Sequence, residues 1–273
     1  MKGLSVAKYK ISPKPGSAVN LQHYDPDYHE SLDDQDIAEE ITKLKAKLES
    51  LQERLYAEGK QSLLVVLQAM DTGGKDGAIK KIFEGVNPQG VRVTAFKAPT
   101  PEELAHDFLW RVHQYTPPRG YIGVFNRSHY EDVLVVRVNN LVPKSVWKTR
   151  YDTINQFEQL LASNGTRILK FYLHISKDEQ KRRLLSRLAN PKKQWKFAMG
   201  DLPVREQWDD YMEAYEVLLQ RCNTDYAPWH IIPANHKWYR DLIVTKTIVA
   251  TLEDMNPKFP PPEPGLDKVV IPD

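Results

Sequence analysis

A short, almost wholly apolar run followed at once by a glycine-rich loop constrains the fold of this chain most. The run is Ser62-Leu-Leu-Val-Val-Leu-Gln68, and the loop is Met70-Asp-Thr-Gly-Gly-Lys-Asp-Gly77. Apolar runs of this length are typical of central parallel strands that are covered on both faces. A glycine-rich turn between such a strand and a helix presents backbone N–H groups and the positive end of a helix dipole to a phosphate. The pattern therefore predicts a strand, a phosphate-binding loop and a helix over about residues 76–83.

Four further segments have the composition of strands, and helical segments separate them. Strands that alternate with helices in this way predict a doubly wound parallel sheet. We therefore expect a single α/β domain over residues 1–273, built on a parallel five-stranded sheet flanked by helices. The further strands are expected at 91–96, 120–125, 167–175 and 229–233, and the longer helices at about 34–58, 144–163, 204–221 and 239–253.

The two ends of the chain are expected to lie outside this alternation. Residues 1–30 are polar and contain prolines, which predicts an extended arm that either wraps the domain or is partly disordered. Residues 256–273 form a Pro-rich tail. The helix over about 34–58 carries a narrow apolar stripe from Ile37 to Leu55. The stripe favours packing against the same domain, with contact to another subunit as the alternative.

Charge and cysteine content exclude several classes of protein. The net charge of +2, from 38 basic and 36 acidic residues, excludes a broadly polycationic nucleic-acid coat, so any polyanion site must be a local concentration of charge. The single cysteine, Cys222, excludes an intrachain disulfide and a Cys-rich zinc site, which fits a reducing cytoplasm. No signal-peptide pattern and no apolar run of membrane-spanning length is visible. We expect neither nucleic acid nor a membrane as a partner.

The glycine loop departs from the usual G-x-x-x-x-G-K-[ST] pattern at two positions. Ala69 stands where the first glycine belongs, and Asp76 replaces the residue whose hydroxyl would bind magnesium. Lys75 is placed to reach the outer phosphates. Asp71 would repel those phosphates unless a cation lay between them, so it is the candidate magnesium ligand. An ordinary glycine turn with a surface lysine and a turn-forming aspartate is the alternative.

The strand at 120–125 ends in Asn126-Arg-Ser-His-Tyr-Glu-Asp132. Ligands of open parallel sheets bind beyond the carboxyl ends of the strands, so Arg127 is placed to face the same phosphates as Lys75. Glu131 could contact a metal, a nucleotide or Arg127, and Asn126 stands where many P-loop enzymes keep a metal-associated aspartate. A surface salt bridge is the alternative for Arg127, and His129 and Tyr130 are equally well explained by packing against the following helix.

A strongly basic segment follows the strand at 167–175. Ser176 and Glu179 match a capping box, and Arg183 and Arg187 are four residues apart, which places them on one helical face. Asn190-Pro191 ends the helix, and a cluster of lysines follows around Trp195. Arginines on a closing lid align and neutralise a transferring phosphoryl group and exclude water. We therefore interpret residues 176–200 as a movable basic lid, with a solvated basic helix as the alternative.

Three separated blocks of this sequence resemble the polyphosphate kinase 2 family of P-loop kinases, which is distantly similar to thymidylate kinase. The blocks are Leu67-Gln-Ala-Met-Asp-Thr-Gly-Gly-Lys-Asp-Gly77, Phe125-Asn-Arg-Ser-His-Tyr-Glu-Asp132, and Ser176-Lys-Asp-Glu-Gln180 continuing through Trp195-Lys-Phe197. Asn126, His129 and Glu131 stand where many family members have aspartate, tryptophan and asparagine. This variant of the second block is similar to the class III subgroup, whose members phosphorylate both AMP and ADP.

The resemblance implies a P-loop kinase fold with a helical lid, and transfer of the terminal phosphoryl group of polyphosphate to AMP and ADP, forming ADP and ATP reversibly. It also implies Mg²⁺ at Asp71, with Mn²⁺ as an alternative ion, and a homodimer or homotetramer. The catalytic residues it implies are Asp71, Lys75, Arg127, Glu131, Arg183 and Arg187. The candidate phosphate- and nucleotide-binding residues are Gly73, Gly74, Asp76, Gly77, Asn126, Lys193 and Lys196, and the polyphosphate contacts are Lys80 and Lys81.

Two other functions fit parts of this pattern. A nucleoside monophosphate kinase with ATP as donor would share the loop and the basic lid, although Ala69 and Asp76 count against it. A non-enzymatic module that binds polyanions or RNA would need aromatic stacking platforms beside its basic residues. Trp195 and Tyr172, near the basic lid, match that requirement weakly.

Overall fold

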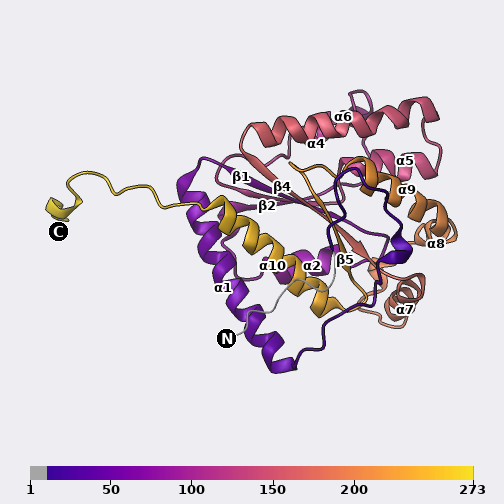
Figure 1. Ribbon diagram of the computed structural model, residues 1–273, viewed down its shortest axis with the longest axis horizontal. Coiled ribbons are helices and arrows are strands. Elements are labelled where there is room, and N and C mark those ends of the chain that lie inside the picture. The colour runs from indigo at the N-terminus through magenta and orange to yellow at the C-terminus, as the bar shows by residue number, and fades with distance from the viewer. Residues whose placement is uncertain (1–10, 273) are drawn as a thin grey trace.

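A single five-stranded sheet, parallel throughout, forms the centre of the molecule (Figure 1). The computed structural model describes residues 11–272, so the first ten residues of the predicted arm and the last residue of the predicted tail lie outside the described residues. The strand order is β2-β3-β1-β4-β5, which confirms the predicted sheet. The strands are β1 (Ser62–Gln68), β2 (Val91–Ala95), β3 (Ile122–Asn126), β4 (Thr166–His174) and β5 (Trp229–Pro233).

Helices cover both faces of this sheet, as Figure 1 shows. On one face, α10 (Lys237–Met255) contacts both α1 (Asp34–Glu58) and α2 (Lys75–Ile82). On the other face, α5 (Val135–Val138), α6 (Lys144–Ser163) and α9 (Trp208–Arg221) pack together. The remaining short helices are α3 (Pro101–Leu104), α4 (Trp110–His113), α7 (Lys177–Leu188) and α8 (Asp201–Glu206). No helix among the described residues is both long and apolar enough to cross a membrane.

Local sequence explains where the elements on either side of β1 begin and end. Asp33 accepts a hydrogen bond from the Gln35 N–H and so caps α1, and Gly59 ends that helix in a left-handed conformation. The stripe of α1 buries Leu48 and Leu55 completely against α10. The predicted packing of this helix within its own domain is therefore confirmed. All seven residues of β1 are buried, as expected of a central strand covered on both faces.

Several predicted boundaries are wrong by small amounts. The helix expected at 204–221 is two helices, α8 and α9, because Gln207 takes a non-helical ψ of 24° between them. The helix after the glycine loop begins at Lys75 rather than at residue 76. The helical part of the basic segment ends at Leu188, and only a short 3₁₀ turn, Gln194–Lys196, follows it.

The described part of the N-terminal arm, residues 11–30, wraps the domain rather than leaving it. The Ile231 N–H of β5 donates to the Ile11 carbonyl at 2.7 Å, and the Leu21 N–H donates to Glu216 of α9 at 2.8 Å. Farther along, the Asn235 N–H donates to the Pro26 carbonyl at 3.1 Å. The arm therefore covers the β5 edge of the sheet and ends beside the loop between β5 and α10. The C-terminal tail instead leaves the body of the molecule (Figure 1).

Candidate active site

The glycine loop connects β1, the middle strand of the sheet, to α2. Gly73 passes so close to Ala69 that a Cβ at position 73 would overlap the Ala69 side chain. The alanine that replaces the usual first glycine is thus tolerated because residue 73 has no side chain. Gly74 lies just before α2 with a φ of 98°, and a Cβ there would overlap the guanidinium of Arg240. Both glycines are therefore required by the backbone path of this loop.

Lys75 extends back along this loop instead of into solvent. Its Nζ donates to the Ala69 carbonyl at 2.8 Å, and only 8% of the residue is exposed. Burial lowers the pKa of Lys75 to about 8, and the nearby positive charge of Arg127 contributes to this shift. A buried ammonium held beside another cation is stabilised when an anion binds next to both. The interpretation of this residue as a surface lysine is therefore wrong.

Arg127 meets the glycine loop because β3 pairs directly with β1. Asn126, the last residue of β3, is in register with Leu67, so the two strands end at the same edge of the sheet. Arg127 donates to Asp71 at 2.9 Å, and Asn126 donates to Asp76 at 2.7 Å. The structure thus brings together both candidate residues of the β3 end with the acidic residues of the loop. The backbone of Arg127 has a φ of 61°, an uncommon conformation that marks functional sites in many proteins.

Glu131 completes the group of charges around Lys75 and Arg127. Burial raises the pKa of Glu131, although the positive charges of Arg127 and Lys75 act in the opposite direction. The charges of Lys75 and Arg127 therefore act on this carboxylate, as expected of residues in one site. Behind it, Gln68 of β1 donates to the Ser128 hydroxyl at 3.1 Å, which ties the end of β1 to the turn that carries Glu131.

His129 and Tyr130 are buried under this turn, which agrees with the packing alternative, and they contact a buried ion pair. The Tyr130 hydroxyl donates to Glu158 of α6 at 2.8 Å, and a ring nitrogen of His129 lies 3.2 Å from the same carboxylate. Lys170 of β4 donates to Glu158 at 2.5 Å and to the Cys222 carbonyl at 2.6 Å. Glu158 and Lys170 are fully buried. This network fixes the two residues that follow Ser128.

The two arginines of the predicted lid do different things. Arg183 is 7% exposed and donates to the carbonyls of Thr72 at 3.0 Å and Ala234 at 2.6 Å, so it lies directly behind the glycine loop. Arg187 donates to the Lys196 carbonyl at 3.0 Å and lies 3.7 Å from Asp201. Arg187 thus holds the distal part of the basic segment, and the structure does not bring it to the glycine loop.

The other basic candidates lie on the surface. Lys193 and Lys196 are exposed, and the Nζ of Lys196 lies 5.0 Å from the Trp195 ring centroid. Lys80 and Lys81 are exposed on α2, and Lys81 forms an ion pair with Glu84 at 3.4 Å.

The capping box predicted at the start of α7 is only half correct. The Ser176 hydroxyl does accept a hydrogen bond from the Glu179 N–H at 3.1 Å. The Glu179 carboxylate does not return to Ser176, however, because it accepts hydrogen bonds from Arg182 at 2.6 Å and from Arg183 at 2.5 Å. Two guanidinium groups outcompete a backbone N–H for this carboxylate, since charge-assisted hydrogen bonds are the stronger ones.

Sequence reasoning missed two residues that contact the loop. Gln180 donates to the Asp71 carbonyl at 3.1 Å. Arg240 of α10 is 2% exposed, pairs with Asp241 and packs on Gly74. The only signal for Arg240 in the sequence is a single arginine within an otherwise apolar helical face.

The carboxylates at this site suit a metal ion that is held largely by its substrate. Among residues 11–272, no group of three or more His, Cys, Asp or Glu side chains is arranged to hold a metal. Asp71 and Glu131 nevertheless lie within the same group of charges. Mg²⁺ typically takes one or two protein carboxylates and completes its shell with phosphate oxygens and water. The residues present fit that mode of binding.

A parallel sheet whose middle strand leads into a phosphate-binding loop, with an arginine at the end of the neighbouring strand, defines a P-loop kinase fold. The profile of the family described as Polyphosphate kinase 2 (PPK2) matches residues 31–260. The chain belongs to this family.

Individual relatives match over nearly the whole chain. The AMP/ADP-polyphosphate phosphotransferase of Meiothermus ruber is 54% identical over 97% of this chain and 99% of its own length. The ADP-polyphosphate phosphotransferase of Rhodopseudomonas palustris is 46% identical over 82% of each chain. The crystal structure of polyphosphate kinase 2 from Arthrobacter aurescens TC1 is 43% identical, has a TM-score of 0.89 and covers 93% of this chain and 91% of its own.

Proposed function

We propose that this protein transfers the terminal phosphoryl group of inorganic polyphosphate to AMP and to ADP, forming ADP and ATP in a reversible reaction. The observation that carries the proposal is the convergence of Lys75 and Arg127 beside the glycine loop, at one edge of the sheet. The Meiothermus ruber relative, named as an AMP/ADP-polyphosphate phosphotransferase, supports the choice of both acceptors.

The residues around the loop have the roles that phosphoryl transfer requires. That reaction needs alignment of donor and acceptor and neutralisation of the charge that spreads over the transferring group. Lys75, at the start of α2, and Arg127, just after β3, supply positive charge, and the N-terminus of α2 adds the positive end of a helix dipole. Glu131, which senses the charge of both cations, would position the acceptor or a bound metal ion.

Asp71 would hold Mg²⁺ or Mn²⁺ together with phosphate oxygens of the substrate. Such an ion supplies further neutralisation of phosphate charge. The Asp71 carboxylate is 20% exposed and lies next to Arg127, so the same arginine would orient it. Since Asp71 follows β1 by three residues, its place at the sheet edge is fixed by the central strand.

A polyphosphate donor is supported by a second concentration of cations behind the loop, the α7–α10 cation cluster. Its members are Arg182, Arg183, Lys237 and Arg240. Burial lowers the pKa of Lys237, and the charges of Arg183, Arg240 and Arg182 lower it further, although Glu179, which pairs with two of these arginines, acts in the opposite direction. A polyanion without a base or sugar would relieve the repulsion between Lys237 and the arginines, and its binding would weaken with added salt.

The test compares donors for the same acceptor. Purified protein is incubated with AMP, Mg²⁺ and either polyphosphate or ATP, and ADP is measured by chromatography. We expect ADP with polyphosphate in the absence of any nucleoside triphosphate. Formation of ADP from AMP with ATP as donor, but not with polyphosphate, would favour an ATP-dependent nucleoside monophosphate kinase. A protein that binds polyphosphate without turnover would be a binding module.

A matched pair of variants assigns the turnover to this site. Lys75→Ala removes the buried ammonium of the loop, and Lys60→Ala removes an exposed lysine just before β1. We expect loss of turnover only in the first variant. Retention of full turnover in Lys75→Ala would refute the assignment of the site.

Further features of the proposal concern the setting of the enzyme. We propose a homodimer or homotetramer, following the family resemblance. We also propose a cytoplasmic enzyme, which agrees with the single, buried cysteine Cys222 and with nucleotide substrates. Light scattering of the purified protein would measure the number of subunits, and fractionation of the source cells would measure the compartment.

A further inference from the structure

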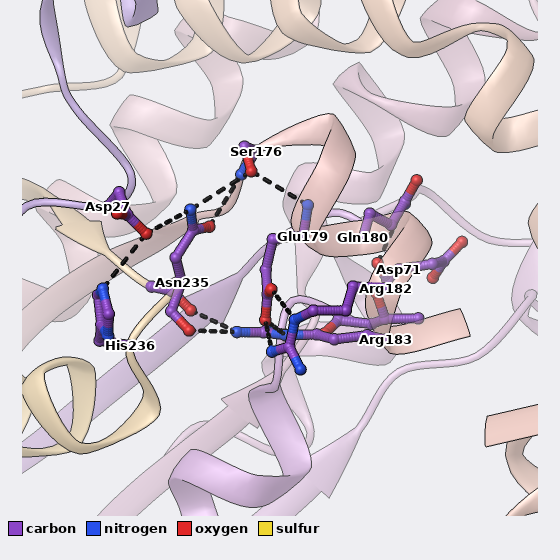
Figure 2. A network of polar contacts seen from close by, with 11 residues as sticks. Asp27, Asp71, Ser176, Glu179, Gln180, Arg182, Arg183, Asn235 and His236 are labelled. Carbon is purple, nitrogen blue, oxygen red and sulfur yellow. Dashed lines mark hydrogen bonds and ion pairs between the residues drawn. The ribbon is translucent and has the colours of Figure 1, made fainter. Parts of the chain in front are cut away.

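Asn235, in the loop between β5 and α10, connects three parts of the molecule that lie far apart in sequence (Figure 2). Its side-chain Nδ2 donates to Asp27 of the N-terminal arm at 3.1 Å and to the Ser176 hydroxyl at 3.3 Å. Its Oδ1 accepts a hydrogen bond from the Ser176 N–H at 3.1 Å. Its backbone carbonyl accepts one from Arg183 at 3.1 Å. One asparagine therefore fixes the arm, the first residue before α7 and the arginine behind the glycine loop.

Arg183 passes this restraint to the glycine loop itself. The same guanidinium that contacts Asn235 donates to the Thr72 carbonyl at 3.0 Å, and Glu179 holds its Nε at 2.5 Å. One turn earlier on α7, Gln180 donates to the Asp71 carbonyl at 3.1 Å. Because a trans peptide keeps its C=O and the next N–H pointing in opposite directions, anchoring these carbonyls also fixes the N–H groups of Thr72 and Gly73.

The loop needs such support because Thr72 has a φ of 63°, a left-handed conformation that β-branched residues rarely adopt. Backbone in this conformation persists only where its surroundings hold it. The bonds from Gln180 and Arg183 flank Thr72 on both sides. The start of α7 is therefore attached to the loop. The distal half of the basic segment differs, because Arg187 bonds there to Lys196 of the same segment.

We propose that Asn235 is a positioning residue for phosphoryl transfer. It connects the N-terminal arm to Ser176 and Arg183, and through them it holds the glycine loop in shape. The arm thereby helps to maintain the site, although in this network it bonds to Asn235 and not directly to the glycine loop. Asn235 acts only through these neighbours. This inference rests on the proposed function for its kinetic readout but not for its structural one.

A reversal of the polar pair between the arm and the loop tests this proposal. Asn235→Asp places a second carboxylate against Asp27 and removes the amide donor. Asp27→Asn with Asn235→Asp restores one donor and one acceptor with the roles exchanged. Asn20→Asp is the matched control, because it adds the same negative charge to the arm at a position outside this network and keeps the cap that Asn20 provides to the Gln22 N–H.

Hydrogen exchange of the protein without substrate gives the direct readout. We expect faster exchange of amides 71–75 in Asn235→Asp, unchanged exchange in Asn20→Asp, and recovery in the reversed pair. The buried amides of β1 and β4 should exchange at the same rate in all variants, since the change is local. Acceleration of these core amides together with the loop, or no acceleration of the loop, would overturn the proposal.

Steady-state kinetics adds the functional readout. We expect kcat with polyphosphate and AMP to fall about tenfold in Asn235→Asp, because small displacements at a site cost large factors in rate. The reversed pair should regain most of that kcat. A reversed pair as slow as Asn235→Asp would overturn the coupling through Asp27. Absence of turnover in the unaltered protein would instead overturn the proposed function, and the exchange result would still decide the role of Asn235.

Discussion

Replacing Gly74 by alanine should damage both stability and activity, whereas the same change at Gly85 should affect stability alone. The two glycines have nearly equal backbone conformations, with φ values of 98° and 94°. A Cβ at Gly85 would meet nothing within 4 Å, but a Cβ at Gly74 would overlap the Arg240 guanidinium. The pair therefore separates the cost of the backbone conformation from the cost of displacing Arg240.

The magnitudes follow from these two contributions. A left-handed conformation costs an alanine roughly 1–2 kcal/mol, and both variants should lose that much free energy of unfolding. Arg240 is 2% exposed and so has little room to retreat. Overpacking of this kind costs about 1–3 kcal/mol more, which only Gly74→Ala should show. Because Gly74 immediately precedes Lys75, we also expect kcat/KM with polyphosphate to fall about a hundredfold in this variant.

Urea denaturation followed by circular dichroism measures the loss of stability, and ADP formation measures the activity. Gly85→Ala should retain activity close to that of the unaltered protein. Equal losses of stability in the two variants would refute the role assigned to the Arg240 contact. Full activity in Gly74→Ala would refute the account of the glycine loop.

Other predictions test individual charges. The kcat/KM of the unaltered protein should fall as pH rises through about 8, because Lys75 loses the proton that gives it its charge. In Lys75→Arg this fall should move above about pH 10. A fall that stays near pH 8 in the variant would contradict the assignment to Lys75. Glu158→Ala should lower the free energy of unfolding by about 3–5 kcal/mol by leaving Lys170 buried without its partner. Asp152→Ala, which breaks an exposed ion pair, should lower the free energy of unfolding by less than about 1 kcal/mol. Equal losses in Asp152→Ala and Glu158→Ala would contradict the account of Glu158 and Lys170 as a buried pair. Arg127→Ala should lower kcat about a thousandfold with little change in urea midpoint, and a small kcat effect would remove Arg127 from the site.

The meeting of the glycine loop with Arg127 could be predicted because it depends on short-range rules. An apolar run followed by glycines identifies β1 and its loop, and parallel strands that are neighbours end at a common edge. The register between Leu67 and Asn126 then places Arg127 beside Asp71 without any knowledge of distant packing. The apolar stripe of α1 is predictable for the same reason, since helical periodicity is a local property.

The environment of the arginines could not be predicted in this way. Periodicity places Arg183 and Arg187 on one face of α7, but it does not say whether that face meets a ligand, a backbone carbonyl or another turn. Arg240 stands in a helix whose pattern gives no reason to bury a guanidinium under a loop over 160 residues earlier. The burial of Glu158 against Lys170 depends likewise on how α6 packs on β4, which tertiary structure decides.

The most direct test of the central claim is the time course of products from AMP, polyphosphate and Mg²⁺, followed by ³¹P NMR. We predict that ADP forms first and that ATP follows from it while the polyphosphate signal declines, with both products lost in Lys75→Ala. Accumulation of ADP without ATP would contradict transfer to both acceptors. Failure to form either nucleotide would contradict polyphosphate-dependent phosphoryl transfer by this site.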